Sequence, residues 1–195
     1  HEGDVQKLIA KLELLQAGDV LVLAGSIPGS VPDDIYRRIM SEMSGRGIEV
    51  VVDATKELLV NVLEYHPFLI KPNHHELGEI FGVELKTRED VIPYARRMQQ
   101  MGARNVLVSM AAAGAVLVAE DKSVYETDAP KGILVNGVGA GDSMVAGFLA
   151  GWMEKKEYRH AFAMGVSAGS ASAFSERLAE KKEIMDLYRR EFTRS

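Results

Sequence analysis

Residues 135–152 read VNGVGAGDSMVAGFLAGW, and this stretch decides the fold because a Gly-rich turn runs directly into an apolar helical pattern that begins near Ala140. The first N–H groups of a helix have no partner within it, and the helix dipole is positive at that end. Such a turn is therefore typical of a phosphate-binding site. An acidic residue, Asp142, nevertheless lies at this helix start, which would favour a phosphate.

Two familiar phosphate-binding motifs are excluded by the wording of this turn. A dinucleotide fingerprint needs glycine at its sixth position, but counting from Gly137 gives Asp142 and counting from Gly139 gives Met144. A Walker A loop needs Gly-Lys followed by Ser or Thr, and the sequence here is Gly-Asp-Ser.

The residue types instead favour phosphoryl transfer. The backbone N–H groups of Gly139, Ala140 and Gly141 can form an anion hole for the charge that builds on a phosphoryl group in transit. Asp142, kept ionised by the same dipole, can accept the proton of the attacking hydroxyl as a general base. The alternative is structural: Asp142 is an acid favoured in a first helical turn, and the glycines serve a tight turn.

Strand and helix patterns alternate along the chain, which predicts parallel βαβ units and an α/β fold. Residues 105–127 are hairpin-like and predict an antiparallel portion at one edge of the sheet. We expect one domain over residues 1–195. The expected strands are residues 19–26, 48–53, 68–71, 105–110, 114–119 and 123–127, and the expected helices are residues 5–15, 32–46, 56–64, 76–81, 87–101, 158–174, 179–192 and the helix from residue 140.

Ligands of such sheets bind beyond the carboxyl ends of the strands. We therefore expect the chemistry to gather at Gly25-Ser26, Asp53, the segment 71–73, Ser109 and the turn before Asp142. Asp53 is equally consistent with a lining residue of the site and with a plain turn residue.

Composition narrows the class of protein. The 195 residues are 47% hydrophobic and 26% charged, with a net charge of −5 and no cysteine. Cysteine chemistry and disulfides are thereby excluded, and the scattered Lys and Arg residues indicate no nucleic-acid partner. The longest apolar stretch near the end, residues 144–153, is too short to span a bilayer, and no signal peptide is visible, so we expect no membrane partner and a cytoplasmic protein.

The stretch around Asp142 resembles the C-terminal signature of the ribokinase-like (PfkB) carbohydrate kinases. Three further segments resemble family motifs in the expected order. These are LAGSIP at residues 23–28, KPNHHEL at residues 71–77 and VSMAAAG at residues 108–114. The resemblance covers nearly the whole chain.

The resemblance implies a three-layer αβα fold with a mostly parallel sheet and ATP and Mg²⁺ as cofactors. Asp142 would be the catalytic base, and the N–H groups of Gly139, Ala140 and Gly141 would form the anion hole. Asn73 and Glu76 would organise Mg²⁺ through water, which suits an ion that keeps part of its hydration shell.

The implied nucleotide site has three further parts. Lys71 would reach a nucleotide phosphate, and Ser167 with Gly169-Ser170 would border the adenine pocket. The loop lining the ATP site would be Ser109, Met110, Ala111, Ala112, Ala113 and Gly114.

The wording within the family is most similar to the 1-phosphofructokinase branch, which implies transfer of phosphate from ATP to D-fructose 1-phosphate, giving fructose 1,6-bisphosphate. The alternatives are a tagatose-6-phosphate kinase or another sugar kinase of the family. An alternative of another class is a non-catalytic nucleotide-binding module, which would need the cradle of residues 139–141 but not Asp142.

Three departures from the family pattern matter. Ala111 stands where the family usually has Gly, so its Cβ would reshape the loop if positive φ is needed there. Asn136-Gly137-Val138 stands in place of the commoner Asp-Thr-x, which removes a carboxylate and a hydroxyl linked to a monovalent cation, so we predict no such cation site.

The third departure is the N-terminal portion with its substrate-binding residues and lid, which is absent from this chain. The chain opens at His1 and not at Met. We therefore expect residues 1–195 to be the nucleotide-binding part, carrying the catalytic base, of a longer kinase domain. We also expect this part to be inactive alone, and the whole protein to form a homodimer through the lid.

His74 and His75 beside Glu76 invite a metal site, but neighbouring side chains on a helix diverge. We expect these two rings to be solvated. Trp152 lies at core spacing and is expected to pack.

Overall fold

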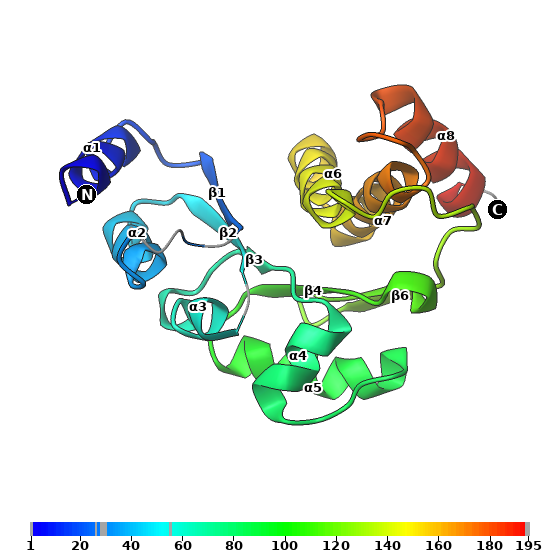
Figure 1. The fold of residues 1–195 in the computed structure, drawn as a ribbon, viewed down its shortest axis with the longest axis horizontal. Helices are drawn as coiled ribbons and strands as arrows, with labels where there is room; N and C mark the ends of the chain where they lie inside the picture. Colours follow the sequence, from blue (N-terminus) through cyan, green and yellow to red (C-terminus); the bar gives the residue numbers. More distant parts are fainter. Residues whose placement is uncertain (1, 26, 28–30, 55, 194–195) are drawn as a thin grey trace. The chain divides into compact units, whose positions relative to one another are not determined.

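The chain alternates strands and helices, as Figure 1 shows for the computed structural model, which describes residues 2–25, 27, 31–54 and 56–193. Ser26 and Pro28 of the expected Gly-Ser-x-Pro turn lie outside these residues. The strands are β1 (Val20–Ala24), β2 (Glu49–Asp53), β3 (Leu69–Ile70), β4 (Asn105–Ser109), β5 (Ala115–Val118) and β6 (Val124–Thr127). The helices are α1 (Glu2–Leu12), α2 (Ile35–Met43), α3 (Lys56–Val60), α4 (His74–Phe81), α5 (Arg88–Gln100), α6 (Ala140–Lys155), α7 (Tyr158–Ala173) and α8 (Lys181–Phe192), with 3₁₀ turns η1 (Leu63–Tyr65) and η2 (Ala111–Ala113).

The strands form a six-stranded sheet in the order β1-β2-β3-β4-β5-β6. Strands β1 to β4 pair in parallel, with Val22 opposite Val51 in β2 and Leu69 opposite Asn105 in β4. Strands β5 and β6 pair antiparallel. The α/β class, the mostly parallel sheet and the antiparallel hairpin are thus confirmed, whereas the three-layer order stays a prediction.

Two compact units make up the chain: residues 1–108 with 120–122, and residues 109–119 with 123–195. In the first unit, helices α2, α3 and α4–α5 connect successive parallel strands, and the right-handed crossover rule places all of them on one face of the strands. Val51, Val52, Leu69 and Ile70 of the central strands are fully buried. Each such side chain contributes about 1.5–3 kcal/mol of burial free energy.

A polar network fastens the amino ends of the strands in the first unit. The buried Asn105 donates to the Phe68 carbonyl at 2.8 Å and accepts from the Glu120 amide at 2.8 Å. Arg104 bonds the Glu120 carboxylate at 2.9 Å and pairs with Glu49. The Glu120 hydrogen bond is the main reason that the pKa of Arg104 is raised. This end of the sheet therefore serves stability, and the carboxyl ends are left for ligands.

The second unit is built around the close approach of α6 and α7. A Cβ added at Gly147 would lie 2.5 Å from Ala168 Cβ, and one added at Gly151 would lie 2.9 Å from Ala161 Cα. The expected packing role of these two glycines is confirmed. Trp152 packs only in part: it is half-buried and stacks on Tyr158 at 4.7 Å between ring centroids.

Several element boundaries differ from the expected ones. The helix expected to run to residue 15 ends at Leu12, where the Arg46 guanidinium donates to the Leu12, Glu13 and Leu15 carbonyls. The helix expected to run to residue 46 ends at Met43, ahead of Gly45 and Gly47, which both have φ of 73°.

The elements around β3 are also shorter than expected. The helix expected over 56–64 breaks into α3 and the separate turn η1. The strand expected over 68–71 shrinks to Leu69–Ile70, although the Phe68 amide still bonds the Val50 carbonyl at 2.8 Å. Among the described helices, none combines the length and apolar character needed to cross a bilayer.

We predict that Gly147→Ala destabilises the chain, because the added Cβ meets Ala168 in a packed interface. Overpacking of this kind costs about 1–3 kcal/mol. The control is Gly3→Ala in α1, where a Cβ meets nothing within 4 Å and the better helix propensity should stabilise. Urea unfolding of both variants gives the comparison. Equal stabilisation by the two alanines would show that α6 and α7 do not pack as closely as described.

Candidate functional site

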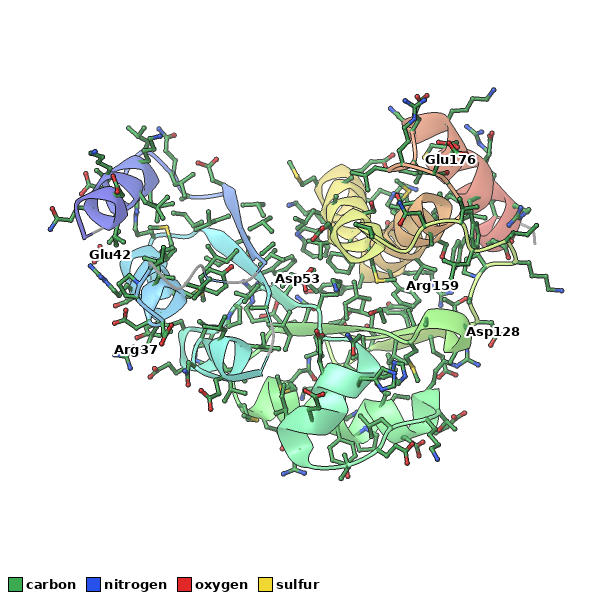
Figure 2. All side chains as sticks on the ribbon, in the orientation of Figure 1. Arg37, Glu42, Asp53, Asp128, Arg159 and Glu176 are labelled. Atoms are coloured by element: carbon green, nitrogen blue, oxygen red, sulfur yellow. The ribbon has the colours of Figure 1, made fainter. Side chains whose placement is uncertain are left out.

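The carboxyl ends of β1, β2 and β3 bring together Gly25, Asp53 and Lys71 in the first unit. The Gly25 amide donates to the Asp53 carbonyl at 3.2 Å, and the Lys71 ammonium lies 3.3 Å from the Asp53 carboxylate. Parallel strands end at the same edge of a sheet, which is why residues far apart in the sequence meet here. Figure 2 labels Asp53 among the side chains.

The ion pair of Lys71 and Asp53 is largely buried, with side-chain exposures of 8% and 18%. A charge removed from water needs a partner, since breaking a buried pair leaves an uncompensated charge. Asp53 therefore balances the Lys71 ammonium and holds it in place. Asp53 thus has a charged partner at the carboxyl ends of the strands, and a site-lining role stays a prediction.

Tyr36 is a neighbour of this pair that the sequence did not reveal. Its hydroxyl donates to the Gly25 carbonyl at 3.2 Å. Burial raises the pKa of Tyr36, and the Asp53 charge raises it further. The phenol thus stays protonated and acts as a donor. Its place in α2 carries no motif, so no signal in the sequence points to it.

Asn73 and Glu76 form a capping box at the start of α4. The Asn73 amide donates to Glu76 Oε2 at 2.8 Å, and the Glu76 amide donates to Asn73 Oδ1 at 2.9 Å. The spacing of these two residues could have predicted this cap. It gives them a structural role besides the predicted one, and it fixes both side chains at the edge of the sheet where Lys71 follows β3.

These residues fit a Mg²⁺ ion held through water. Over the part of the chain that the structure describes, no group of three or more His, Asp or Glu side chains could hold a metal. These residues therefore do not surround a metal with protein ligands alone. Mg²⁺ commonly binds one or two carboxylates together with waters and nucleotide phosphates. The carboxylate of Glu76 and the amide oxygen of Asn73 provide such a donor set.

His74 and His75 were expected to diverge, but their ring centroids lie 3.9 Å apart. That expectation was wrong because both rings sit in the first turn of α4, where they tilt onto each other. His75 is exposed, as predicted.

The loop of residues 109–114 lies in the second unit. The Met110 amide donates to the Gly114 carbonyl at 2.9 Å, which closes the loop around η2. The methyl groups of Ala111, Ala112 and Ala113 are exposed, whereas Met110 is buried. The loop thus presents small side chains and backbone to solvent, as a surface against a flat ligand would. Ser109, the end of β4, is half-buried.

Ala111 is held with φ of +48°, in the left-handed region. Residue 111, where the family usually has glycine, therefore does adopt a positive φ. A left-handed alanine costs roughly 1–2 kcal/mol because its Cβ crowds the following carbonyl. The loop tolerates this strain because it is closed at both ends by hydrogen bonds.

Gly139 is the N-cap residue of α6 and has φ of 76° and ψ of 0°, a conformation that favours glycine. Within the described residues the amides of Gly139 and Gly141 donate to no acceptor, as predicted for an anion hole. The Ala140 amide differs, because it donates to the Gly137 carbonyl at 3.3 Å and closes a turn. Of the three amides predicted to form an anion hole, two are therefore unpaired.

Asp142 lies in the first turn of α6 and is exposed. In the described part of the chain it makes no hydrogen bond and no ion pair, and Gly139 has no side-chain cap. A carboxylate that capped the helix would accept from the first-turn amides. The Asp142 carboxylate therefore does not cap α6 and is left unpaired at the surface.

The residues predicted to border adenine are less accessible than expected. Ser167 is fully buried, and its hydroxyl has no partner among the described residues. A Cβ at Gly169 would meet the Ala140 carbonyl at 3.0 Å, so this part of α7 packs against the first turn of α6. Ser170 is half-buried. Ser167 cannot line an open pocket in this conformation.

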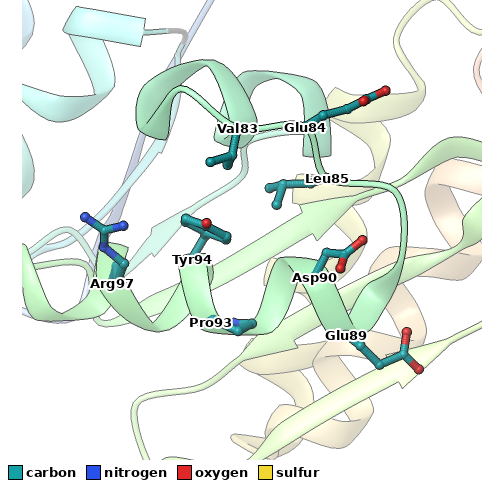
Figure 3. Close-up of a pocket in the computed structure, with 8 residues that line it drawn as sticks. All are labelled: Val83, Glu84, Leu85, Glu89, Asp90, Pro93, Tyr94 and Arg97. Atoms are coloured by element: carbon teal, nitrogen blue, oxygen red, sulfur yellow. The ribbon is translucent and has the colours of Figure 1, made fainter.

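Two surface pockets lie away from every predicted residue. One of about 560 Å³, between α4 and α5, is lined by Val83, Tyr94, Arg97 and their neighbours (Figure 3). The other, of about 490 Å³, is lined by β6 and the ends of α7 and α8.

We predict that Ala111→Gly stabilises the chain relative to Ala112→Gly, its matched control in the same turn. Glycine removes the left-handed strain at 111 but only adds backbone entropy at 112, where φ is not positive. The difference in the free energy of unfolding should be about 1–2 kcal/mol, the cost of a left-handed Cβ. Urea titrations of both variants measure it, and equal destabilisation would contradict the left-handed assignment.

Comparison with known proteins places these features in a family. Residues 1–184 match the family described as pfkB family carbohydrate kinase. The chain is similar to 1-phosphofructokinase of Bacillus subtilis, with 46% identity over 186 residues, which are 95% of this chain and 61% of that protein. It is also similar to D-tagatose-1-phosphate kinase of Klebsiella oxytoca, with 32% identity, covering 93% of this chain and 60% of that protein.

The fold is similar to a solved structure as well. The crystal structure of phosphofructokinase-2 from Escherichia coli in complex with fructose-6-phosphate superimposes with a TM-score of 0.90 at 28% identity, covering 100% of this chain and 63% of that one. The chain thus spans about three-fifths of the length of the relatives it matches. Because the family match covers nearly all of its residues, the chain belongs to the pfkB family of carbohydrate kinases.

Proposed function

We propose that these residues carry the nucleotide-binding and catalytic-base part of a kinase that transfers the γ-phosphoryl group of ATP to D-fructose 1-phosphate. The products are fructose 1,6-bisphosphate and ADP. The observation that carries the proposal is the exposed Asp142 without a protein partner beside the open amides of Gly139 and Gly141. The 46% identity to a 1-phosphofructokinase supports the choice of sugar.

The base in this reaction is Asp142. Its carboxylate accepts the proton of the sugar hydroxyl while that oxygen forms a bond to the γ-phosphorus. The bond between this phosphorus and the bridging oxygen breaks, and ADP leaves with the electron pair. A carboxylate without a competing partner is ready for this proton, which a capping carboxylate would not be.

The amides of Gly139 and Gly141 hold the charge that develops on the phosphoryl oxygens. The hydrogen bond from the Ala140 amide to the Gly137 carbonyl is long, at 3.3 Å, so a phosphoryl oxygen can compete for this third donor. The positive end of the α6 dipole adds to the attraction. The cradle and the base share one helical turn, which fixes their spacing.

Two further groups of residues are assigned to nucleotide binding. Lys71 binds a phosphate with its ammonium, and Ser109 through Gly114 line the nucleotide. Mg²⁺, held through water by Asn73 and Glu76, would neutralise phosphate charge when bound. ATP and sugar phosphates are metabolites of the cytoplasm, and we therefore propose that the protein is cytoplasmic. We also propose that the whole protein forms a homodimer.

A tagatose phosphate is the second candidate substrate. Its support is the 32% identity to a D-tagatose-1-phosphate kinase, whose name gives the phosphate at position 1 and not at position 6. Fructose and tagatose phosphates differ at one hydroxyl, so both fit the same base and cradle. The higher identity to the 1-phosphofructokinase and the wording of the motifs favour fructose 1-phosphate.

The test is ADP release with Mg²⁺–ATP by the full-length protein that contains these residues. Fructose 1-phosphate, tagatose 1-phosphate, tagatose 6-phosphate, fructose 6-phosphate and ribose are offered side by side. The highest kcat/KM on fructose 1-phosphate supports the proposal, and preference for another sugar corrects the substrate. No turnover on any sugar with ATP still bound would replace the kinase by a nucleotide-binding module.

We predict that Asp142→Asn lowers kcat by about 10²–10⁴-fold, the contribution of a general base. Binding of ATP should persist, because the backbone cradle is unchanged. The matched control is Glu57→Gln, which neutralises another exposed acid in a first helical turn, that of α3. Steady-state kinetics and nucleotide titration separate the two effects. Similar kcat values in both variants would return Asp142 to a purely structural role.

We predict that Lys71→Met raises the KM for ATP about 10- to 150-fold, the loss of a hydrogen bond to a charged group. The control is Lys86→Met, at an exposed lysine 3.3 Å from Glu84. Because Lys71→Met leaves Asp53 buried with its charge unbalanced, the double variant with Asp53→Asn is measured too. Recovery of the KM in that double variant would mean that Lys71 serves only to balance Asp53.

A further inference from the structure

Strand β6 is an edge strand of the sheet in the second unit. It pairs antiparallel with β5, and no further strand follows it in the strand order of the described residues. The Ala119 amide donates to the Ser123 carbonyl at 3.0 Å, and the bonded pairs of an antiparallel ladder recur at every second residue. The alternate positions, Val124 and Glu126, therefore direct their N–H and C=O groups away from β5.

This outer edge is open. Among the described residues, the outward N–H and C=O groups of Val124 and Glu126 have no hydrogen-bond partner. Glu126 is exposed and Val124 is half-buried, whereas β5 is buried throughout. Proteins commonly protect such an edge with lysine, proline, a bulge or a covering segment, because it is a template for another strand. Strand β6 contains neither lysine nor proline, so it can accept a further strand.

The surface beside this edge carries charges of both signs. Tyr125 faces α7, with its ring centroid 6.4 Å from that of Phe162, and the Arg159 guanidinium lies 5.4 Å from the Tyr125 centroid (Arg159 is labelled in Figure 2). The pocket of about 490 Å³ extends along the strand here. Its charged lining residues are Glu126, Lys155, Glu157, Arg159 and Glu191. A partner of one charge sign would meet like charges, whereas an identical copy offers both signs to both signs, as a two-fold interface requires.

The backbone of β6 allows one favourable two-fold register. Pairing Val124 with itself would need Lys122 for the next bonded pair, but Lys122 has φ of 71° and is not extended. Pairing Glu126 with itself would set two carboxylates directly opposite each other, which is destabilising. With Tyr125 opposite Tyr125, each Val124 pairs with the other copy's Glu126 and four backbone hydrogen bonds form. The two Tyr125 rings then lie side by side, each with an Arg159 above it.

We infer that the outer edge of β6 is an interface between two copies of this protein, which join antiparallel about a two-fold axis at Tyr125. The contact is short, so we expect association to be reversible and to depend on protein concentration. It is separate from the homodimer proposed for the whole protein, and it does not depend on the proposed catalytic function.

The first experiment measures the mass of the full-length protein by light scattering at several concentrations. Glu126→Pro removes a backbone donor from the outer edge and leaves the bonds to β5 intact, since proline is tolerated where the N–H faces away from the sheet. Glu126→Ala is the matched control, because it loses the same carboxylate but keeps the N–H. We expect wild type and Glu126→Ala to reach at least twice the mass of Glu126→Pro.

Equal masses for all three proteins at every concentration would overturn the inference. Comparing masses between variants makes the result independent of any other interface that the full-length protein has. Thermal unfolding checks that Glu126→Pro is folded. If it is not, the cysteine variants described next decide alone.

The second experiment determines the register by disulfide cross-linking, because residues 1–195 contain no cysteine. Tyr125→Cys places two thiols in a non-hydrogen-bonded pair, where Cα atoms lie about 4.5 Å apart, within reach of a disulfide. The matched control is Thr127→Cys on the same face of β6. In this register its two copies would be about 14 Å apart along the strands.

Mild oxidation of the full-length variants should give a disulfide-linked dimer of Tyr125→Cys and not of Thr127→Cys, with the unsubstituted protein as background. Equal linking of both variants would show random collision, and linking of neither would show that the edges do not meet; either result would overturn the inference. Both experiments need no substrate. Failure of the proposed kinase reaction would therefore leave their outcomes unchanged.

Discussion

The close approach of α6 and α7 is the constraint on which the second unit depends. Glycines at 147 and 151 let the two buried helices come so near that a single added methyl group at either position would collide with α7. Helix α6 is thereby fixed along its length, and so is its first turn, where the amides and Asp142 lie. A pre-organised cradle costs no reorganisation when charge develops, which is where most of its catalytic value lies. Packing at residue 147 and chemistry at residue 142 are thus two ends of one rigid element.

Several polar groups in this chain serve the fold and the ligand together. Asn73 and Glu76 start α4 through a capping box and are also the donors proposed for hydrated Mg²⁺. Asp53 balances Lys71 at the sheet edge and orients the ammonium that we propose to bind a phosphate. Such double use explains why a purely structural interpretation fits each residue alone. Asp142 differs from them because its carboxylate has no hydrogen-bond partner in the described part of the chain, which leaves it available for the proposed ligand.

Much of the architecture could be predicted because local sequence patterns determine it. Apolar runs ending in Asp53 or Ser109 mark buried parallel strands, and the glycines before Asp142 mark the start of a helix. The pairing of Lys71 with Asp53 could not be predicted, since strand ends converge only once the register is known. The same holds for β3, whose shortness follows from its neighbours. At Ala111 the sequence showed an unusual residue, but only the closed loop shows that its backbone is left-handed.

The charges of the residues proposed for the reaction explain why phosphate would be bound mainly by backbone groups. Asp53, Glu76 and Asp142 are acidic, and Lys71 is the one basic side chain among the residues assigned to the reaction. A nucleotide triphosphate brought to such a set meets more negative than positive side-chain charge. Fixed dipoles attract phosphate without adding a titratable group, so the α6 terminus can supply the missing positive potential and still keep Asp142 as a base. An additional lysine in the cradle would bind phosphate more tightly, but it would also pair with Asp142 and withdraw the carboxylate from the hydroxyl proton. In the proposed reaction, the backbone amides at the glycines would bind the phosphate and leave the Asp142 carboxylate unpaired, which explains how an acid can stand beside a phosphate-binding turn.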